Sequence, residues 1–178
     1  GADGKMLKAS GNLALDAFGF VQLSGGFAIE SKDSSLVLAD GTTVQTRLLT
    51  VGGSNINGFA GNNGNSADRL GLTLTGAEFG LAMQSSKATP AKSWTSLQAN
   101  VASVALVGID GLTLAGSNLS IKLNQAALLA DPVADYAAQN LVVATGPADT
   151  LTLDMAGADG RMLKASGTLA LDAFGFVQ

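Results

Sequence analysis

The two ends of the chain carry almost the same sequence. Residues 1–22 read GADGKMLKASGNLALDAFGFVQ and residues 157–178 read GADGRMLKASGTLALDAFGFVQ, so 20 of 22 positions agree. Only Lys5 against Arg161 and Asn12 against Thr168 differ. Repetition at a fixed period is the signature of repeat architectures, and it constrains this chain more than any other feature.

The repeat divides the chain into one complete unit, residues 1–156, and the start of a second unit, residues 157–178. We expect a tandem array cut within its series, because the chain starts without Met and shows no signal peptide. Successive units are then expected to pack end to end, with the opening segment of one, equivalent to residues 1–22, completing the sheet of the one before. The alternative is a deliberate duplication, in which a second copy of one segment completes an open edge.

Apolar residues recur two apart along most of the chain, which is the spacing of one face of a β-strand. The clearest examples lie at residues 13–15 and 27–29. Further strands are expected at residues 35–38, 43–51, 101–107, 141–144 and 151–154. Asp40-Gly41 lies between two such runs and predicts a hairpin turn.

Two separate segments, residues 71–83 and 111–123, share one pattern. In both, the apolar positions change from even to odd numbers after an inner glycine, Gly76 or Gly116. One extra residue at a glycine is what a β-bulge supplies, so a bulge is predicted in each segment.

Helical patterns are few. Residues 94–104 and 126–130 are the candidates, whereas the Gly- and Asn-rich residues 52–65 are predicted to form a long loop. The sequence therefore predicts an all-β unit, either an elongated β-sandwich or a β-solenoid-like repeat, with at most one or two short helices.

Composition excludes several kinds of chemistry. The chain has no Cys and no His, which removes disulfides, thiolate and imidazole metal ligands, and Ser-His-Asp catalysis. A net charge of −4 without a basic run argues against binding of nucleic acid. The uncharged residues 93–109 are too short and too polar to predict a membrane-spanning helix.

No catalytic residue and no enzymatic activity is predicted. Asp16 and Glu30 follow two similar strands and are the best carboxylate pair, but carboxylates at strand ends commonly face solvent. Lys8 and Ser10 lack any partner that would activate a nucleophile. No cofactor is predicted either, because the Gly-rich segments lack the Lys-Ser/Thr ending of a phosphate loop.

Calcium is the metal that suits an acidic chain without His or Cys, because it takes oxygen ligands. The candidate ligands are Asp40, Asp68, Asp110, Asp131, Asp135 and Asp159. None of them has EF-hand spacing and turn formation explains most of them, so we predict no metal site and keep a structural calcium ion as the minor alternative.

The chain carries little charge, since only 13% of its residues are Asp, Glu, Lys or Arg. Such a surface fits a unit whose ends are covered by its neighbours. The segment that follows the first strand is more apolar than simple alternation requires, and its copy repeats this feature. The residues predicted to contact the neighbouring repeat are Phe18, Phe20, Val21, Leu23, Phe174, Phe176 and Val177.

The segments LKASGNLALDAFGFVQLSGGFAIE, DGTTV, VGGSNINGFAG and GLTLTGAEFGLAM resemble repeats of giant bacterial surface and secreted proteins. These tandem-repeat proteins are grouped with adhesins, and some carry an LEPR-XLL signature or calcium-binding nonapeptides. The resemblance covers most of the complete unit, residues 1–156, and implies a β-rich rod outside the cell. It implies no catalytic residue, and the calcium-binding nonapeptide is missing from this sequence.

The sequence thus predicts a structural repeat of a giant extracellular bacterial protein, forming a rod or fibre for adhesion, matrix or cell–cell contact. Its predicted partners are neighbouring repeats of the same protein. Two alternatives remain open. One is a module on a surface array that binds a glycan or a partner surface through residues 52–65, and the other is a subunit of a non-covalent filament.

Overall fold

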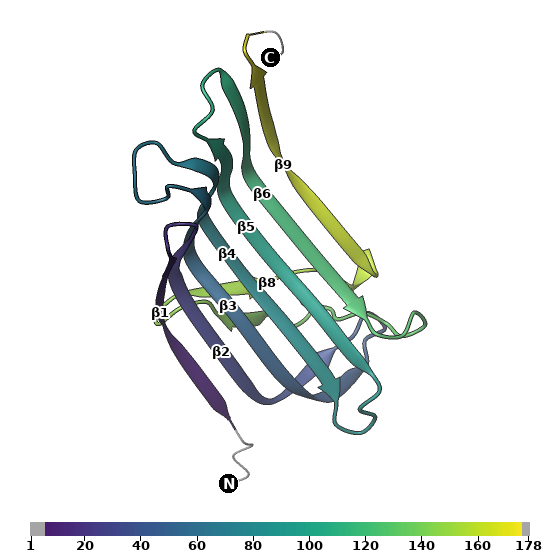
Figure 1. The fold of residues 1–178 in the computed structure, drawn as a ribbon. Helices are drawn as coiled ribbons and strands as arrows, with labels where there is room; N and C mark the ends of the chain where they lie inside the picture. The colour runs from purple at the N-terminus through teal and green to yellow at the C-terminus, as the bar shows by residue number, and fades with distance from the viewer. Residues whose placement is uncertain (1–5, 176–178) are drawn as a thin grey trace.

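A computed structural model describes residues 6–175, and its main body is a single antiparallel sheet (Figure 1). The sheet has seven strands in the order β1-β2-β3-β4-β5-β6-β9. These strands are β1 Leu7–Ala17, β2 Val21–Val37, β3 Thr43–Asn62, β4 Leu70–Ser86, β5 Ser93–Val107, β6 Leu112–Ala126 and β9 Met162–Ala173. A hairpin of β7 Leu141–Ala144 and β8 Thr150–Leu153 and a 3₁₀ turn, Gly157–Asp159, lie between β6 and β9.

Consecutive strands β1 to β6 are neighbours, so most of the sheet is a meander joined by short turns. The hairpin predicted at Asp40-Gly41 is confirmed, since Val37 pairs with Thr43 across it. Gly41 has a φ of 81°, a backbone conformation that residues other than glycine rarely adopt. The Asp40 carboxylate accepts hydrogen bonds from the backbone N–H and the hydroxyl of Thr42, at 2.9 Å and 2.7 Å.

The β7–β8 hairpin and the segments beside it cross the back of the sheet and cover part of that face (Figure 1). The core lies between these two layers. Its largest fully buried side chains include Trp94, Tyr136, Leu48, Leu153 and Val143.

Buried polar groups in this core form a continuous hydrogen-bonded chain. The hydroxyl of Thr46 donates to Gln84 Oε1 at 2.9 Å, and Gln84 Nε2 donates to the Tyr136 hydroxyl at 3.3 Å. Tyr136 donates to Ser96 Oγ at 3.1 Å, which in turn donates to Asn124 Oδ1 at 3.0 Å. Burial raises the pKa of the Tyr136 phenol, and the bonds of Ser96 and Gln84 oppose that shift.

A line of irregular positions crosses the middle of the sheet. Gly76 has a φ of 60° and drops out of the pairing with β3 and β5, as the predicted bulge requires. In the second segment the residue with positive φ is Asn118, at 50°, rather than Gly116, and the register shifts between Ser117 and Ser120. The change of parity seen in the sequence therefore keeps the apolar side chains on one face.

The predicted loop at residues 52–65 is wrong, because β3 continues to Asn62. The glycines in this run permit close backbone approach rather than turns. A Cβ at Gly52 would clash with the carbonyl oxygen of Ala144, and a Cβ at Gly61 would clash with that of Leu70. Residues 94–104 likewise form part of β5 and not a helix.

The all-β prediction is confirmed, and the arrangement is sandwich-like, with a long sheet and a small second layer. The strands of the main sheet pair side by side as a meander rather than coiling as a solenoid. Between residues 6 and 175 there is no α-helix, and no helix in this part of the chain could cross a membrane.

Candidate functional site: the two repeated edge strands

The two copies of the repeated sequence form the two edge strands of the sheet. β1 and residues 163–173 of β9 are the same sequence except for Asn12 and Thr168, and they lie six strands apart. β9 is the seventh strand of an antiparallel sheet, so it runs in the same direction as β1 (Figure 1). One strand sequence therefore occupies two equivalent positions, related by a displacement across the sheet.

Each copy uses the edge that the other copy leaves open. β1 pairs with β2, from Leu7 opposite Ser31 to Ala17 opposite Val21. β9 pairs through its other edge with β6, from Met162 opposite Asn124 to Ala173 opposite Leu112. The open edge of β9 therefore presents the same backbone groups that β1 uses to bind β2. In the same way, the open edge of β1 presents the groups that β9 uses to bind β6.

The turn that follows the repeated strand has the same conformation in both copies. Phe18 and Gly19 have φ values of 55° and 71°, and the backbone N–H of Gly19 donates to Asp16 Oδ1 at 2.8 Å. In the second copy, Phe174 and Gly175 have φ values of 53° and 73°. There the N–H of Gly175 donates to Asp172 Oδ1 at 3.0 Å, so this turn forms where no paired strand follows among the described residues.

The first turn has further polar support from the β3–β4 connection. Asn65 Nδ2 donates to Asp16 Oδ2 at 3.2 Å, and Gln22 Nε2 donates both to Asp16 Oδ2 and to Asn65 Oδ1. The N–H of Gly19, with smaller contributions from Gln22 and Asn65, holds the pKa of Asp16 below its usual value. The backbone N–H of Gly64 also donates to the Gly19 carbonyl, at 3.0 Å.

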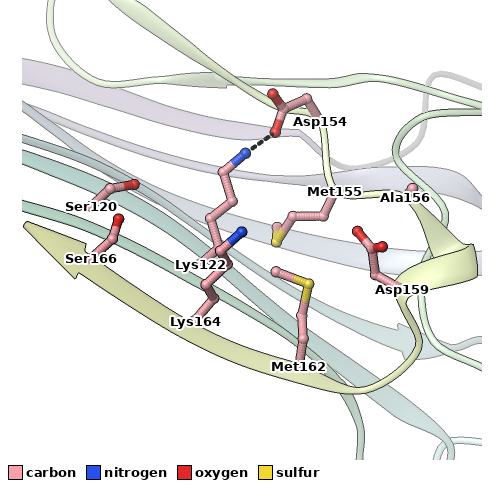
Figure 2. A pocket seen from close by; sticks show the side chains of 9 residues that line it. All are labelled: Ser120, Lys122, Asp154, Met155, Ala156, Asp159, Met162, Lys164 and Ser166. Atoms are coloured by element: carbon pink, nitrogen blue, oxygen red, sulfur yellow. Dashed lines mark hydrogen bonds and ion pairs between the residues drawn. The ribbon is translucent and has the colours of Figure 1, made fainter.

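A groove of about 490 Å³ lies beside β9 on the face that the β7–β8 layer covers. Lys122 and Lys164 are directly paired across β6 and β9, and Figure 2 shows their ammonium groups on the same side. Lys122 Nζ contacts Asp154 Oδ1 at 2.8 Å. Among the described residues, Lys164 makes no ion pair, although it lies directly opposite a like charge.

The predicted contact residues are placed at the turns and at the start of β2. Phe18 is 96% exposed at the tip of its turn, Phe20 and Val21 are exposed, and Leu23 is half-buried in β2. Phe174 is exposed at the equivalent tip. Phe176 and Val177 lie outside the described residues. The contact of these side chains with a neighbouring unit stays a prediction.

The carboxylate pair weighed from the sequence does not come together. Asp16 lies opposite Gln22 and Glu30 lies opposite Lys8, so the two carboxylates belong to opposite ends of the β1–β2 pairing. Glu30 instead contacts Lys32 at 2.6 Å. Within residues 6–175, no three acidic side chains lie close enough together to hold a metal ion.

Two features of the sheet are not predicted from the sequence. The first is the groove beside Lys122 and Lys164. The two lysines lie opposite each other only because of the register between β6 and β9, which the sequence alone does not give. The gathering of apolar side chains on one face of the sheet was hidden by the change in parity at the bulges, although the signal was present in the even-to-odd pattern after Gly76 and Gly116. Comparison with family models, with curated proteins and with solved structures finds no match to this chain.

Proposed function

We propose that this unit is a structural repeat of an extended extracellular bacterial protein, in which one β-sheet continues without interruption from unit to unit. The observation that carries the proposal is the equivalence of β1 and β9 at the two edges of the sheet. In the array, β9 of one unit is also β1 of the next, and its open edge pairs with the next β2. The extracellular location rests on the resemblance to repeats of giant bacterial surface proteins.

The register of this junction follows from the first copy. All eleven pairs of β1 with β2 can form again on β9, from Leu163 opposite Ser31 to Ala173 opposite Val21. The single difference places Thr168 instead of Asn12 opposite Gly26, and Asn12 is exposed at that position, so the smaller threonine is accommodated as well. Phe174 and Gly175 have the same backbone conformation as Phe18 and Gly19, which lead from β1 into β2 in the first copy.

Charge favours the same junction. Like charges directly opposite each other destabilise a sheet, and Lys122 and Lys164 are such a pair. Asp154 compensates Lys122. When β9 takes the position of β1, Lys164 comes opposite Glu30 of the next unit, as Lys8 is opposite Glu30 within this one. Each of the two lysines then has an acidic partner, Asp154 for Lys122 and Glu30 of the next unit for Lys164.

A continuous sheet fixes the length that each unit adds. Every unit contributes six strands, and neighbouring strands lie about 4.8 Å apart, so the axial rise is roughly 29 Å per unit. An even number of strands also keeps every unit in the same orientation. The function of such an array is to supply a long and stiff rod, because backbone hydrogen bonds between strands run along its whole axis.

The test is a chain in which residues 1–156 occur three times before residues 157–178. Electron microscopy and fibre diffraction of this chain should give a rod that grows by about 29 Å for each added unit, with strands perpendicular to its axis. Globular beads joined by flexible linkers, or a rise set by the strand length instead of the strand spacing, would contradict the proposal.

A further inference from the structure

One face of the main sheet carries an apolar surface that crosses all seven strands. A first row of paired residues on this face contains Ile29, Val51, Leu81, Leu97, Leu123 and Leu163. A second row contains Leu15, Leu23, Leu74, Val104 and Leu169. The two rows lie on the same face of the sheet. Leu163 and Leu169 show this, because they are an even number of residues apart on β9, and β1 has the same sequence pattern. We call this surface the apolar face.

The apolar face is open. The β7–β8 layer contacts the opposite side of the sheet, where Val143 and Leu151 lie against Gly80. Large side chains of the apolar face remain exposed, among them Leu72 at 50%, Leu15 at 49% and Ile121 at 37%. From Leu7 to Ala17 and across their partners on the other six strands, this face carries no charged side chain.

The apolar face is larger than the apolar patches that monomeric proteins usually expose to water. Seven strands span about 34 Å and eleven residues span about 37 Å, which gives roughly 1,200 Å². The largest apolar patch on a typical monomer covers about 300–600 Å². The chain also exposes 10019 Å², against about 7,900 Å² for a compact monomer of 17.7 kDa. A stable interface needs about 800 Å² from each partner, so the apolar face is large enough for one.

The apolar face has the form of one half of a β-sandwich. It is hollowed by about 260 Å³ above Gly58, where Leu15, Leu23, Leu72 and Leu74 stand around a position without a side chain. Side chains of a facing sheet interdigitate into such hollows. Beyond the first row, Asp33 lies opposite Arg47 on the same face, which adds the polar rim common to protein interfaces.

We propose that the apolar face is covered by the apolar face of a second copy of this chain, so that two sheets pack face to face. Repetition favours this partner over another protein. If the sheet continues as proposed above, the apolar face recurs every six strands, and a second copy supplies a surface of the same period. That step alone rests on the proposed function, whereas the size and composition of the apolar face do not.

Sedimentation equilibrium of the 178-residue chain tests the proposal. The chain should form a closed dimer, and Leu72→Lys or Ile121→Lys should each raise its dissociation constant by at least about tenfold, because each places an ammonium group in the interface. Thr75→Lys is the matched control, since Thr75 is exposed on the opposite face of β4 and its substitution should leave the dimer unchanged. Circular dichroism verifies that each variant is folded.

A second measurement needs no disruptive change. The chain has no cysteine, so Leu72→Cys and Thr75→Cys each introduce a single thiol. Maleimide labelling of Leu72→Cys should slow by about tenfold or more as the protein concentration rises through the dissociation constant, while labelling of Thr75→Cys should not.

A chain that is monomeric at every concentration overturns the proposal. If that monomer sediments with phosphatidylcholine vesicles, the apolar face binds lipid instead of a second copy. Failure of the face-to-face dimer is distinguishable from failure of the continuous sheet. Association through the edges gives an open series of oligomers that Leu72→Lys leaves intact, whereas association through the apolar face stops at two chains.

Discussion

Phe18 and Phe174 adopt the same left-handed conformation, with φ values of 55° and 53°, at opposite edges of one sheet. A non-glycine residue with positive φ is uncommon and carries a conformational cost. The same strained turn in both copies therefore reflects their shared sequence, with the Asp and Gly that stabilise it. At the second edge, this turn follows β9, a strand whose outer side is open among the described residues.

The equivalence of the two edges gives an unusual prediction for matched variants. Paired prolines at Leu13 and Ala14 weaken β1, because one of two adjacent residues must lose a hydrogen bond to β2. The exposed edge of β2 should then accept β9 of another molecule, and size-exclusion chromatography should show an open series of oligomers. Prolines at Leu169 and Ala170 should have the same effect by exposing β6.

The double variant is the control for that experiment. With prolines in both copies, two edges are exposed but no intact strand remains to fill them, so ordered oligomers should not form. Fluorescence of Trp94, which is 2% exposed in the core, reports whether each variant keeps its fold. Equal assembly of the single and double variants would show that the edges are not complementary.

Gly52 should be intolerant of a side chain. A Cβ at this position would clash with the carbonyl oxygen of Ala144, where β3 passes beneath β7. We expect Gly52→Ala to lower the free energy of unfolding by about 1–3 kcal/mol in urea titrations. Gly11→Ala is the matched control in a strand, since no atom lies within 4 Å of its Cβ. That control should change stability by less than about 0.5 kcal/mol.

Tyr136→Phe should destabilise the core although it removes a single oxygen atom. The Tyr136 hydroxyl donates to Ser96 and accepts from Gln84, and both partners are buried. Without it, two buried polar groups lose a partner, which costs about 1–3 kcal/mol. Urea unfolding measures this loss. Stability equal to that of the parent chain would mean that water or a rearranged Gln84 replaces the hydroxyl.

Stability should depend on pH only outside the neutral range. The N–H of Gly157 leads the contacts that hold the pKa of Asp135 below its usual value, and hydrogen bonds from Thr42 lower the pKa of Asp40. A carboxyl with a lowered pKa contributes stability that is present above its ordinary value near 4 and is lost as the pH falls below it. Thermal unfolding midpoints should therefore drop below about pH 4.

The chain has no histidine, so the same midpoints should stay level between about pH 5 and pH 8. Asp135→Asn should lower the midpoint at pH 7 and reduce its dependence on acid, because the amide keeps one acceptor oxygen without the charge. A midpoint that changes steeply near pH 6.5 would contradict this account of the titrating groups.

Much of the fold was readable from local patterns. Alternation of apolar residues predicted the all-β class, and Asp40-Gly41 predicted its hairpin, because strand pleat and turn geometry are both set by neighbouring residues. Residues 52–65 were misread for a physical reason. Glycine satisfies a loop and a crowded strand equally well, and only the position of Ala144 shows which of the two applies.

The repeat itself determined that residues 7–17 and 163–173 have almost the same sequence, and the missing Cys and His determined which side-chain chemistry is absent. Tertiary structure alone decided that the two copies lie at opposite edges and run in one direction. It also decided that Lys122 faces Lys164 and that one side of the sheet is left open. These relationships depend on pairing between residues far apart in the chain, and the bulges that set each register act on a whole strand rather than on its neighbours in sequence.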